Sequence, residues 1–329
     1  MKRRKLSEGF EVSALGLGCM GMSEFYGPRD DETSLKVLGE AVSRGVDFLD
    51  TADMYGPHHN EELLGHFLSQ SGTRAQLKIA TKFGIVRKPG EYARSLDMSP
   101  AYARRACEAS LKRLGVERID LYYVHRVNSN QDIEDTMGEL SRLVEEGKID
   151  RIGLCEVSAA TLRRAHAVHP VTALQTEYSL WSRGVEAEIL PACRELGIGF
   201  VPYSPLGRGF LTGRFQQAEK FGDGDSRSFL PRFQETALRQ NMRIVEAVQT
   251  IAHQKGCTSG QVALAWLLAQ GDDIVPIPGT KRLSYLIENV AASSVNLTAS
   301  DLQTLDDILS TIPVTGERYT EEGMKGVNA

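Results

Sequence analysis

Residues 46–56 read VDFLDTADMYG and begin with an apolar run that is typical of a buried β-strand. Two similar runs follow, LKIATK at 77–82 and IDLYYVH at 119–125, and a helical pattern comes after each of the three. The same alternation extends to both sides, so that further strands are expected at 15–19, 149–155, 171–179, 198–204 and 273–279. The expected helices are 32–42, 60–70, 99–115, 132–146, 158–168, 185–197, 235–255, 258–270 and one that includes 285–292.

Eight strand–helix units with no Pro-, Gly- or Ser-rich linker between them predict one closed (β/α)8 barrel of the α/β class, a single domain over residues 1–329. The first dozen residues are expected to form a short β-hairpin before the barrel. The stretch 205–234, after the seventh strand, is too long for an ordinary connection, and loops of that length are usually lids or binding loops. The alternative is a tolerated surface insertion.

Composition describes an ordinary globular protein. The chain has 329 residues, a formal charge of -5 and an apolar share of 41%, which implies neither a nucleic-acid nor a membrane partner. The basic start is interrupted by Glu8 and Glu11 where a signal peptide needs an apolar stretch. The five cysteines form no CxxC pair, and their odd number favours reduced thiols. The expected location is therefore cytoplasmic.

Three of the expected strands end in an ionisable side chain that an apolar strand does not need. These are Asp50, Lys82 and His125, and Tyr55 follows the first of them by about one turn. The carboxyl ends of parallel strands face the crevice where ligands bind, so these residues can converge there. An acid, a phenol, an ammonium and an imidazole in one crevice indicate proton-transfer chemistry.

The motifs GLGCMGMS, FLDTADMYG, ATKFG, LYYVHR, QTEYSLWSR, PYSPLGRGFLTG and IPGTKR, in this order, resemble the aldo-keto reductases over nearly the whole chain. The resemblance implies a (β/α)8 barrel that binds a nicotinamide cofactor, NADPH or NADP+, without a Rossmann fold. It also implies an oxidoreductase that reduces aldehydes or ketones to alcohols reversibly, with a small-molecule carbonyl or alcohol as substrate. A cofactor-binding regulatory subunit of the same fold, like the channel-associated members, is the alternative. The oligomeric state stays open.

The family's catalytic residues fall on Asp50, Tyr55, Lys82 and His125. Hydride transfer to a carbonyl leaves an alkoxide, so a proton donor must stand at the oxygen, and Tyr55 is the implied donor. Lys82 is expected to lower the pKa of Tyr55 by stabilising its phenolate, with Asp50 fixing the lysine. His125 is expected to orient the carbonyl. Taken singly, each residue has a structural explanation such as a turn cap or rim packing.

By the same resemblance, Tyr203 is implied to stack on the nicotinamide and Gln175 to bond its carboxamide, while Lys281 and Arg282 meet the 2′-phosphate of NADPH. A solvated helix start is the alternative for these two cations. The implied cofactor contacts are Gly18, Cys19, Met20, Asp50, Cys155, Glu156, Gln175, Tyr203, Ser204, Pro205, Leu206, Arg208, Gly209, Ile277, Gly279, Thr280, Lys281, Arg282, Tyr285, Glu288 and Asn289.

Two departures from the family pattern concern the cofactor. Cys155 and Glu156 stand where many members carry a Ser-Asn pair that bonds the carboxamide, and a thiol is a weak donor. Cys155 can instead be a small buried hydrophobe that faces away from the site. Tyr285 replaces an arginine or glutamine and is expected to stack on the base or ribose, and Glu288 is expected to face the adenine amino group.

Several other patterns have weaker meanings. Residues 16–21 fit GxGxxG, but Gly27 and Pro28 exclude the helix that a dinucleotide-binding βαβ unit requires. His58 and His59 lack a third ligand at metal-site spacing, so no metal is expected. The candidate pocket walls, each of which can equally be packing, are Phe25, Tyr26, Met54, Arg126, Trp181, Phe229 and Tyr319.

Overall fold

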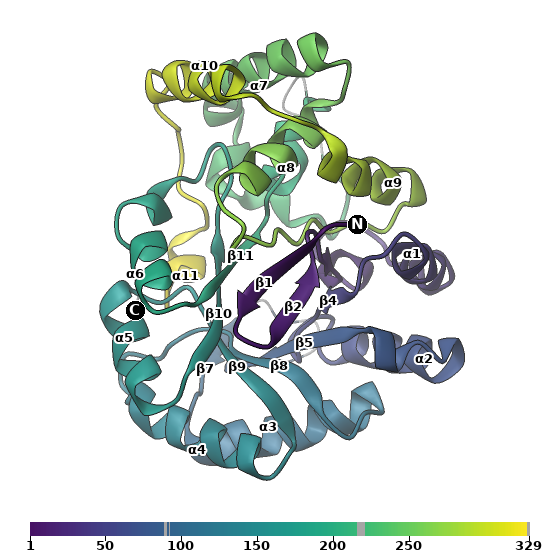
Figure 1. The fold of residues 1–329 in the computed structure, drawn as a ribbon, viewed down its shortest axis with the longest axis vertical. Coiled ribbons are helices and arrows are strands. Elements are labelled where there is room, and N and C mark those ends of the chain that lie inside the picture. The colour runs from purple at the N-terminus through teal and green to yellow at the C-terminus, as the bar shows by residue number, and fades with distance from the viewer. Residues whose placement is uncertain (89–90, 92, 216–220, 328–329) are drawn as a thin grey trace.

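Seven parallel strands form most of a barrel wall in the computed structural model, which describes residues 1–88, 91, 93–215 and 221–327 (Figure 1). Their order in the sheet is β3 (Leu17–Gly18), β4 (Phe48–Asp50), β5 (Lys78–Phe83), β8 (Ile119–Val124), β9 (Ile149–Cys155), β10 (Val171–Glu177) and β11 (Gly199–Tyr203). Every neighbouring pair is parallel, as the alternating sequence pattern predicts.

Residues 273–279, the expected eighth strand, close the barrel through backbone hydrogen bonds on both sides. Phe200 N donates to Asp273 O at 2.8 Å, and Gly16 N donates to Pro276 O at 3.0 Å. The segment forms isolated bridges to β11 and β3 and no continuous strand, because Pro276 and Pro278 have no N–H to donate to a ladder. The predicted (β/α)8 barrel is therefore confirmed.

Helices surround the barrel where the sequence predicts them (Figure 1). They are α1 (Asp31–Ser43), α2 (His59–Ser71), α3 (Pro100–Leu114), α4 (Ile133–Glu145), α5 (Ala159–Val168), α6 (Ile189–Glu195), α7 (Glu235–Lys255), α8 (Ser259–Ala269) and α9 (Leu283–Ala291), followed by α10 (Ala299–Ser310) and α11 (Glu321–Met324). The expected helix at 185–197 divides into a 3-10 turn, η3 (Gly184–Glu186), and α6. Pro191 lies in the first turn of α6, where a missing N–H costs no helical hydrogen bond.

The N-terminal hairpin, β1 (Arg3–Ser7) and β2 (Phe10–Ser13), lies across the amino-terminal end of the barrel (Figure 1). Leu6, Phe10 and Val12 pack with the side chains of the barrel interior. The approach is close, because a Cβ atom added at Gly199 would lie 2.5 Å from Leu6. The hairpin thus closes one end of the barrel with apolar side chains and leaves the carboxyl ends of the strands for a site.

Two segments beside that open end were not assigned to elements by the sequence. Directly after β5 the chain forms a second hairpin, β6 (Ile85–Arg87) and β7 (Arg94–Leu96). The stretch 205–234 contains three 3-10 helices, η4 (Gly207–Thr212), η5 (Ser226–Phe229) and η6 (Pro231–Phe233), while its residues 216–220 lie outside the described part of the chain. Ser226 N donates to Phe25 O at 2.9 Å, so this long loop reaches the segment that follows β3.

Candidate active site

A cavity of about 570 Å3 lies at the carboxyl ends of the strands and extends along the long loop to the start of α9. Of the residues that the sequence places in the site, those lining the cavity are Gly18, Met20, Asp50, Tyr55, His125, Gln175, Tyr203, Ser204, Pro205, Leu206, Arg208, Gly209, Ile277, Gly279, Thr280, Lys281, Arg282, Tyr285, Glu288 and Asn289. Lys82, Cys19, Cys155 and Glu156 are buried outside this lining.

Lys82 lies beneath the cavity and is fully buried. Its Nζ contacts Asp50 Oδ1 and donates hydrogen bonds to Thr51 O at 2.8 Å and to Tyr55 Oη at 3.2 Å. Gln175 Nε2, from β10, donates to the other oxygen of Asp50 at 2.7 Å. Asp50 and the loop after β4 thus contact the ammonium group directly, and Gln175 contacts it through Asp50.

The charges of this cluster differ in part from what the sequence suggests. Burial lowers the pKa of Lys82, but Asp50 and Tyr55 outweigh it, so the pKa lies above its usual value and the amine stays charged. Burial raises the pKa of Tyr55, and Lys82 opposes this effect without reversing it. Lys82 therefore acts on Tyr55 in the expected direction, while the net pKa of the phenol is raised instead of lowered.

His125 stands beside Tyr55 at the end of β8. The two rings meet edge to face, with centroids 5.8 Å apart and an interplanar angle of 82°. Burial lowers the pKa of His125 well below its usual value, and Lys82 and Arg126 act in the same direction, so the imidazole is neutral near pH 7. Its Nδ1 is buried and has no hydrogen-bond partner among the described residues.

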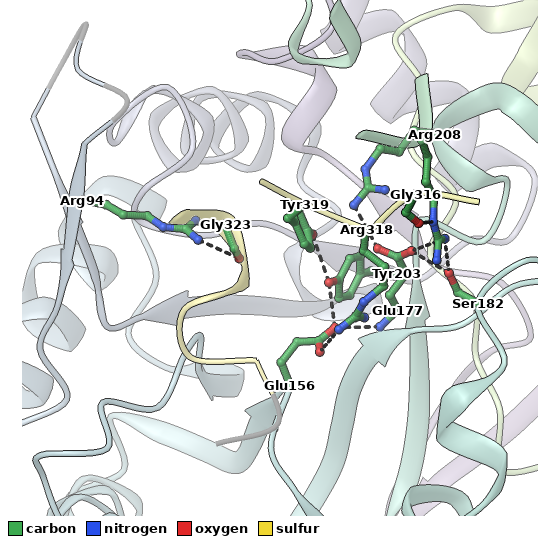
Figure 2. A network of polar contacts seen from close by, with 11 residues as sticks. Arg94, Glu156, Glu177, Ser182, Tyr203, Arg208, Gly316, Arg318, Tyr319 and Gly323 are labelled. Atoms are coloured by element: carbon green, nitrogen blue, oxygen red, sulfur yellow. Dashed lines mark hydrogen bonds and ion pairs between the residues drawn. The ribbon is translucent and has the colours of Figure 1, made fainter. Parts of the chain in front are cut away.

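Glu156 is the centre of a polar network that the sequence does not reveal (Figure 2). Arg318 donates to both oxygens of the Glu156 carboxylate at 3.0 Å, and Tyr203 Oη donates to one of them at 2.7 Å. Tyr319 Oη lies 3.0 Å from Tyr203 Oη. The charge of Arg126 and the contact with Arg318 outweigh burial and hold the pKa of Glu156 below its usual value. The C-terminal segment is thereby tied to β9 and β11.

A second buried carboxylate, Glu177, holds the long loop in place through two of the loop's arginines. Arg208 Nη2 donates to Glu177 Oε2 at 2.9 Å, and Arg232 Nη1 lies 3.5 Å from the other oxygen. Arg232 also donates to Gly316 O at 3.1 Å, and Arg208 lies 4.7 Å from the ring centroid of Tyr319. The long loop and the C-terminal segment therefore contact each other through these residues (Figure 2), and both contribute to the cavity lining.

The candidate pocket walls separate into two groups. Phe25, Tyr26, Met54, Arg126, Phe229 and Tyr319 line the cavity. Trp181 does not, because it is buried and stacked on Phe210 with ring centroids 4.4 Å apart.

Cys155 packs among the side chains of the barrel interior, and burial raises the pKa of its thiol to about 12. This is the placement of a small buried hydrophobe, and it leaves Cys155 outside the cavity lining.

The end of the cavity near α9 is rich in cations. Arg214 stacks on Tyr285, 3.7 Å from the ring centroid, and pairs with Glu288 at 2.8 Å. Arg282 Nη1 donates to Tyr285 Oη at 3.2 Å. Lys281 Nζ donates to the carbonyl oxygens of residues 26 and 28 at 2.8 and 2.7 Å, which joins α9 to the segment after β3. Glu288, expected to face an adenine, thus already has Arg214 as a partner.

Two further observations limit the kinds of site. In the described part of the chain, no three His, Cys, Asp or Glu residues gather as metal ligands, and His58 Nδ1 instead contacts Asp53 O at 2.9 Å. Across the same residues no helix combines the length and apolarity needed to span a membrane.

The chain is similar in sequence and in structure to known proteins. A sequence model of the aldo/keto reductase family matches residues 14–310. The glycerol dehydrogenase of Gluconobacter oxydans is similar in structure, with a TM-score of 0.86 and 25% identity over 96% of this chain and 97% of that one. A thermostable aldo-keto reductase, solved with the inhibitor epalrestat, is similar with a TM-score of 0.76 and 28% identity over 94% of this chain and 100% of that one.

Replacing Arg318 by Met should destabilise the protein, because it leaves the buried Glu156 carboxylate without its bidentate partner. The free energy of unfolding, measured by urea denaturation, should fall by about 3 kcal/mol. Adding Glu156→Gln should recover part of this loss, because the uncompensated charge is then removed. Arg239→Met, which breaks an exposed pair on α7, should change stability by less than about 0.5 kcal/mol. Equal effects of Arg318→Met and Arg239→Met would contradict the buried network.

The lowered pKa of His125 predicts an acid sensitivity. Below about pH 6.5 the unfolded chain binds a proton at this histidine and the folded protein does not, so stability is lost as the pH falls. Between pH 6.5 and 5.5 the wild type should lose about 1 kcal/mol more than His125→Gln. Urea titrations at both pH values measure this difference, and parallel losses in the two proteins would exclude a neutral, buried His125.

Proposed function

The chain belongs to the aldo/keto reductase family, and on that premise we propose that it is an NADPH-dependent oxidoreductase that reduces aldehydes or ketones to alcohols. One observation carries the proposal: a buried lysine lies in hydrogen-bond contact with both Asp50 and the cavity-lining Tyr55. The complete set of Asp50, Tyr55, Lys82 and His125 favours turnover, but a regulatory subunit of this fold can keep the same set. The comparison proteins are named as a dehydrogenase and a reductase, which also favours turnover.

The cavity suits a dinucleotide. Arg208 lines it, and the buried Nη1 of Arg208 has no hydrogen-bond partner among the described residues, so this atom can donate to a phosphate oxygen. A Cβ added at Gly18 would lie 2.9 Å from Ile277 O, so the cavity floor there needs a glycine. We assign the nicotinamide and pyrophosphate to residues 203–209 and the adenosine to residues 279–289. When bound, the nicotinamide supplies the hydride.

Tyr55 is the proposed proton donor to the carbonyl oxygen. Its raised pKa keeps the phenol protonated at neutral pH, as a donor must be. Loss of the proton leaves a phenolate, which the Lys82 ammonium at 3.2 Å stabilises. Asp50 positions Lys82, and Gln175 positions Asp50. The neutral His125 imidazole can donate a hydrogen bond to the same carbonyl oxygen and so orient it.

Tyr55→Phe should reduce kcat by a factor of about 10² or more, because the proton donor is lost while the ring and the cavity shape are kept. The dissociation constant for NADPH, measured by fluorescence quenching, should stay close to that of the wild type. Tyr102→Phe, on α3 and away from the cavity lining, is the matched control and should keep full turnover. Retention of more than about a tenth of wild-type kcat by Tyr55→Phe would remove Tyr55 from the mechanism.

Selectivity for NADPH should depend on Arg282. The 2′-phosphate adds negative charge at the cation-rich end, so Arg282→Ala should weaken NADPH binding by about ten- to a hundredfold and leave NADH binding nearly unchanged. Lys281→Ala should weaken both cofactors, because Lys281 also holds the segment at residues 26–28. Fluorescence titration of the three proteins with both cofactors tests this. A wild type that prefers NADH, or equal losses for both cofactors in Arg282→Ala, would contradict it.

A further inference from the structure

The charged side chains that line the cavity are strongly unbalanced. Among the described residues the lining acids are Asp50 and Glu288, whereas the lining cations are Arg94, Arg126, Arg208, Arg214, Arg227, Lys281 and Arg282. Asp50 is neutralised by Lys82, and Glu288 pairs with Arg214. The phosphates of a dinucleotide account for the cations along the long loop and α9. They do not account for Arg126, whereas Arg94 already donates to backbone oxygens of the C-terminal segment.

Arg94 and Arg126 lie at the other end of the cavity, with the proposed catalytic residues. Arg126 follows His125 directly, and its Nη1 donates to His125 O at 2.7 Å. Arg94 projects from β7, where its Nη2 donates to Gly323 O at 3.1 Å (Figure 2). Besides burial, the charges of both guanidinium groups lower the pKa of His125, so both charges act on this proposed catalytic residue. The nicotinamide end of the cofactor carries no phosphate that would need them.

Arg126 is buried and incompletely satisfied. Only 5% of the surface of Arg126 is exposed, and the Nε atom of its side chain has no hydrogen-bond partner among the described residues. Burial lowers the pKa of Arg126, but Tyr203 and Glu156 outweigh burial, so the pKa lies above its usual value and the guanidinium group stays charged. The Glu156 carboxylate forms its bidentate contact with Arg318. Arg126 therefore keeps its positive charge in the cavity wall, with an Nε–H that no described residue accepts from.

We propose that this end of the cavity binds substrates that carry a carboxylate in addition to the reacting carbonyl, with Arg126 as the counter-ion that determines specificity. The inference rests on the proposed function. A carboxylate matches the planar guanidinium group and accepts charge-assisted hydrogen bonds from it. Phe25, Met54, Ile85 and Phe229 line the same cavity and provide apolar surface for the carbon skeleton. The substrate class is thus the oxo-acids, aliphatic or aromatic, as opposed to neutral aldehydes of equal size.

The test compares each acid with its neutral ester. The pairs are 4-carboxybenzaldehyde with methyl 4-formylbenzoate, and 4-oxobutanoate with its methyl ester, assayed by NADPH oxidation at constant ionic strength. The wild type should show a kcat/KM for the acid that is about ten- to a hundredfold higher, mostly through KM. This comparison requires no variant. Benzoate should also inhibit reduction of the ester competitively, while benzamide should not.

Variants then locate the effect. Arg126→Met should bring the acid-to-ester ratio of kcat/KM close to one. Arg126→Lys keeps the charge but loses the planar guanidinium group with its paired donors, so it should retain part of the ratio. Arg239→Met removes an exposed positive charge on α7 and should leave the wild-type ratio. If the ester is reduced but the acid is no better, or if Arg126→Met keeps the ratio, the inference is overturned and the proposed function stands. If neither ester nor acid oxidises NADPH, the proposed function itself fails.

Discussion

The buried ion pair of Lys82 and Asp50 is the interaction on which the rest of the site depends. Removing an ammonium group from water is expensive, and the expense is offset only if its donors find good partners. Here Asp50, Thr51 O and Tyr55 Oη provide them. Asp50 in turn accepts from Gln175, which lies on β10, whereas Asp50 ends β4. The ion pair joins the neighbouring strands β4 and β5, whereas β4 and β10 are not neighbours, so the hydrogen bond from Gln175 to Asp50 crosses the barrel interior.

The two ends of the barrel are covered in different ways. At the amino-terminal end, the hairpin packs Leu6, Phe10 and Val12 into the apolar interior of the barrel. At the other end, buried ion pairs hold the covering segments in place. Glu156 binds the C-terminal segment through Arg318, and Glu177 binds the long loop through Arg208. Because an unpaired buried carboxylate is so unfavourable, these pairs allow few arrangements of the two segments.

The same logic explains why the cavity has two electrostatic characters. Near α9 and the long loop, cations line the cavity where we propose that the phosphates of a dinucleotide bind. Near His125, the guanidinium group of Arg126 persists beside a neutral imidazole and a neutralised Asp50. We propose that this charge recognises a carboxylate on the substrate.

The sequence by itself determined the barrel and its four proposed catalytic residues. Strand and helix periodicity is local, and Asp50, Lys82 and His125 follow apolar strands whose carboxyl ends must meet at one rim. What the tertiary structure alone decided depends on contacts between distant segments. Arg318 lies 162 positions from Glu156, and no pattern along the chain links a lone arginine to a buried acid. The net rise in the pKa of Tyr55 and the inward placement of Cys155 follow from burial, which depends on how all the strands pack. Residues 273–279 form isolated bridges to β11 and β3 where a continuous strand was expected. Pro276 and Pro278 have no N–H that could donate to a neighbouring strand.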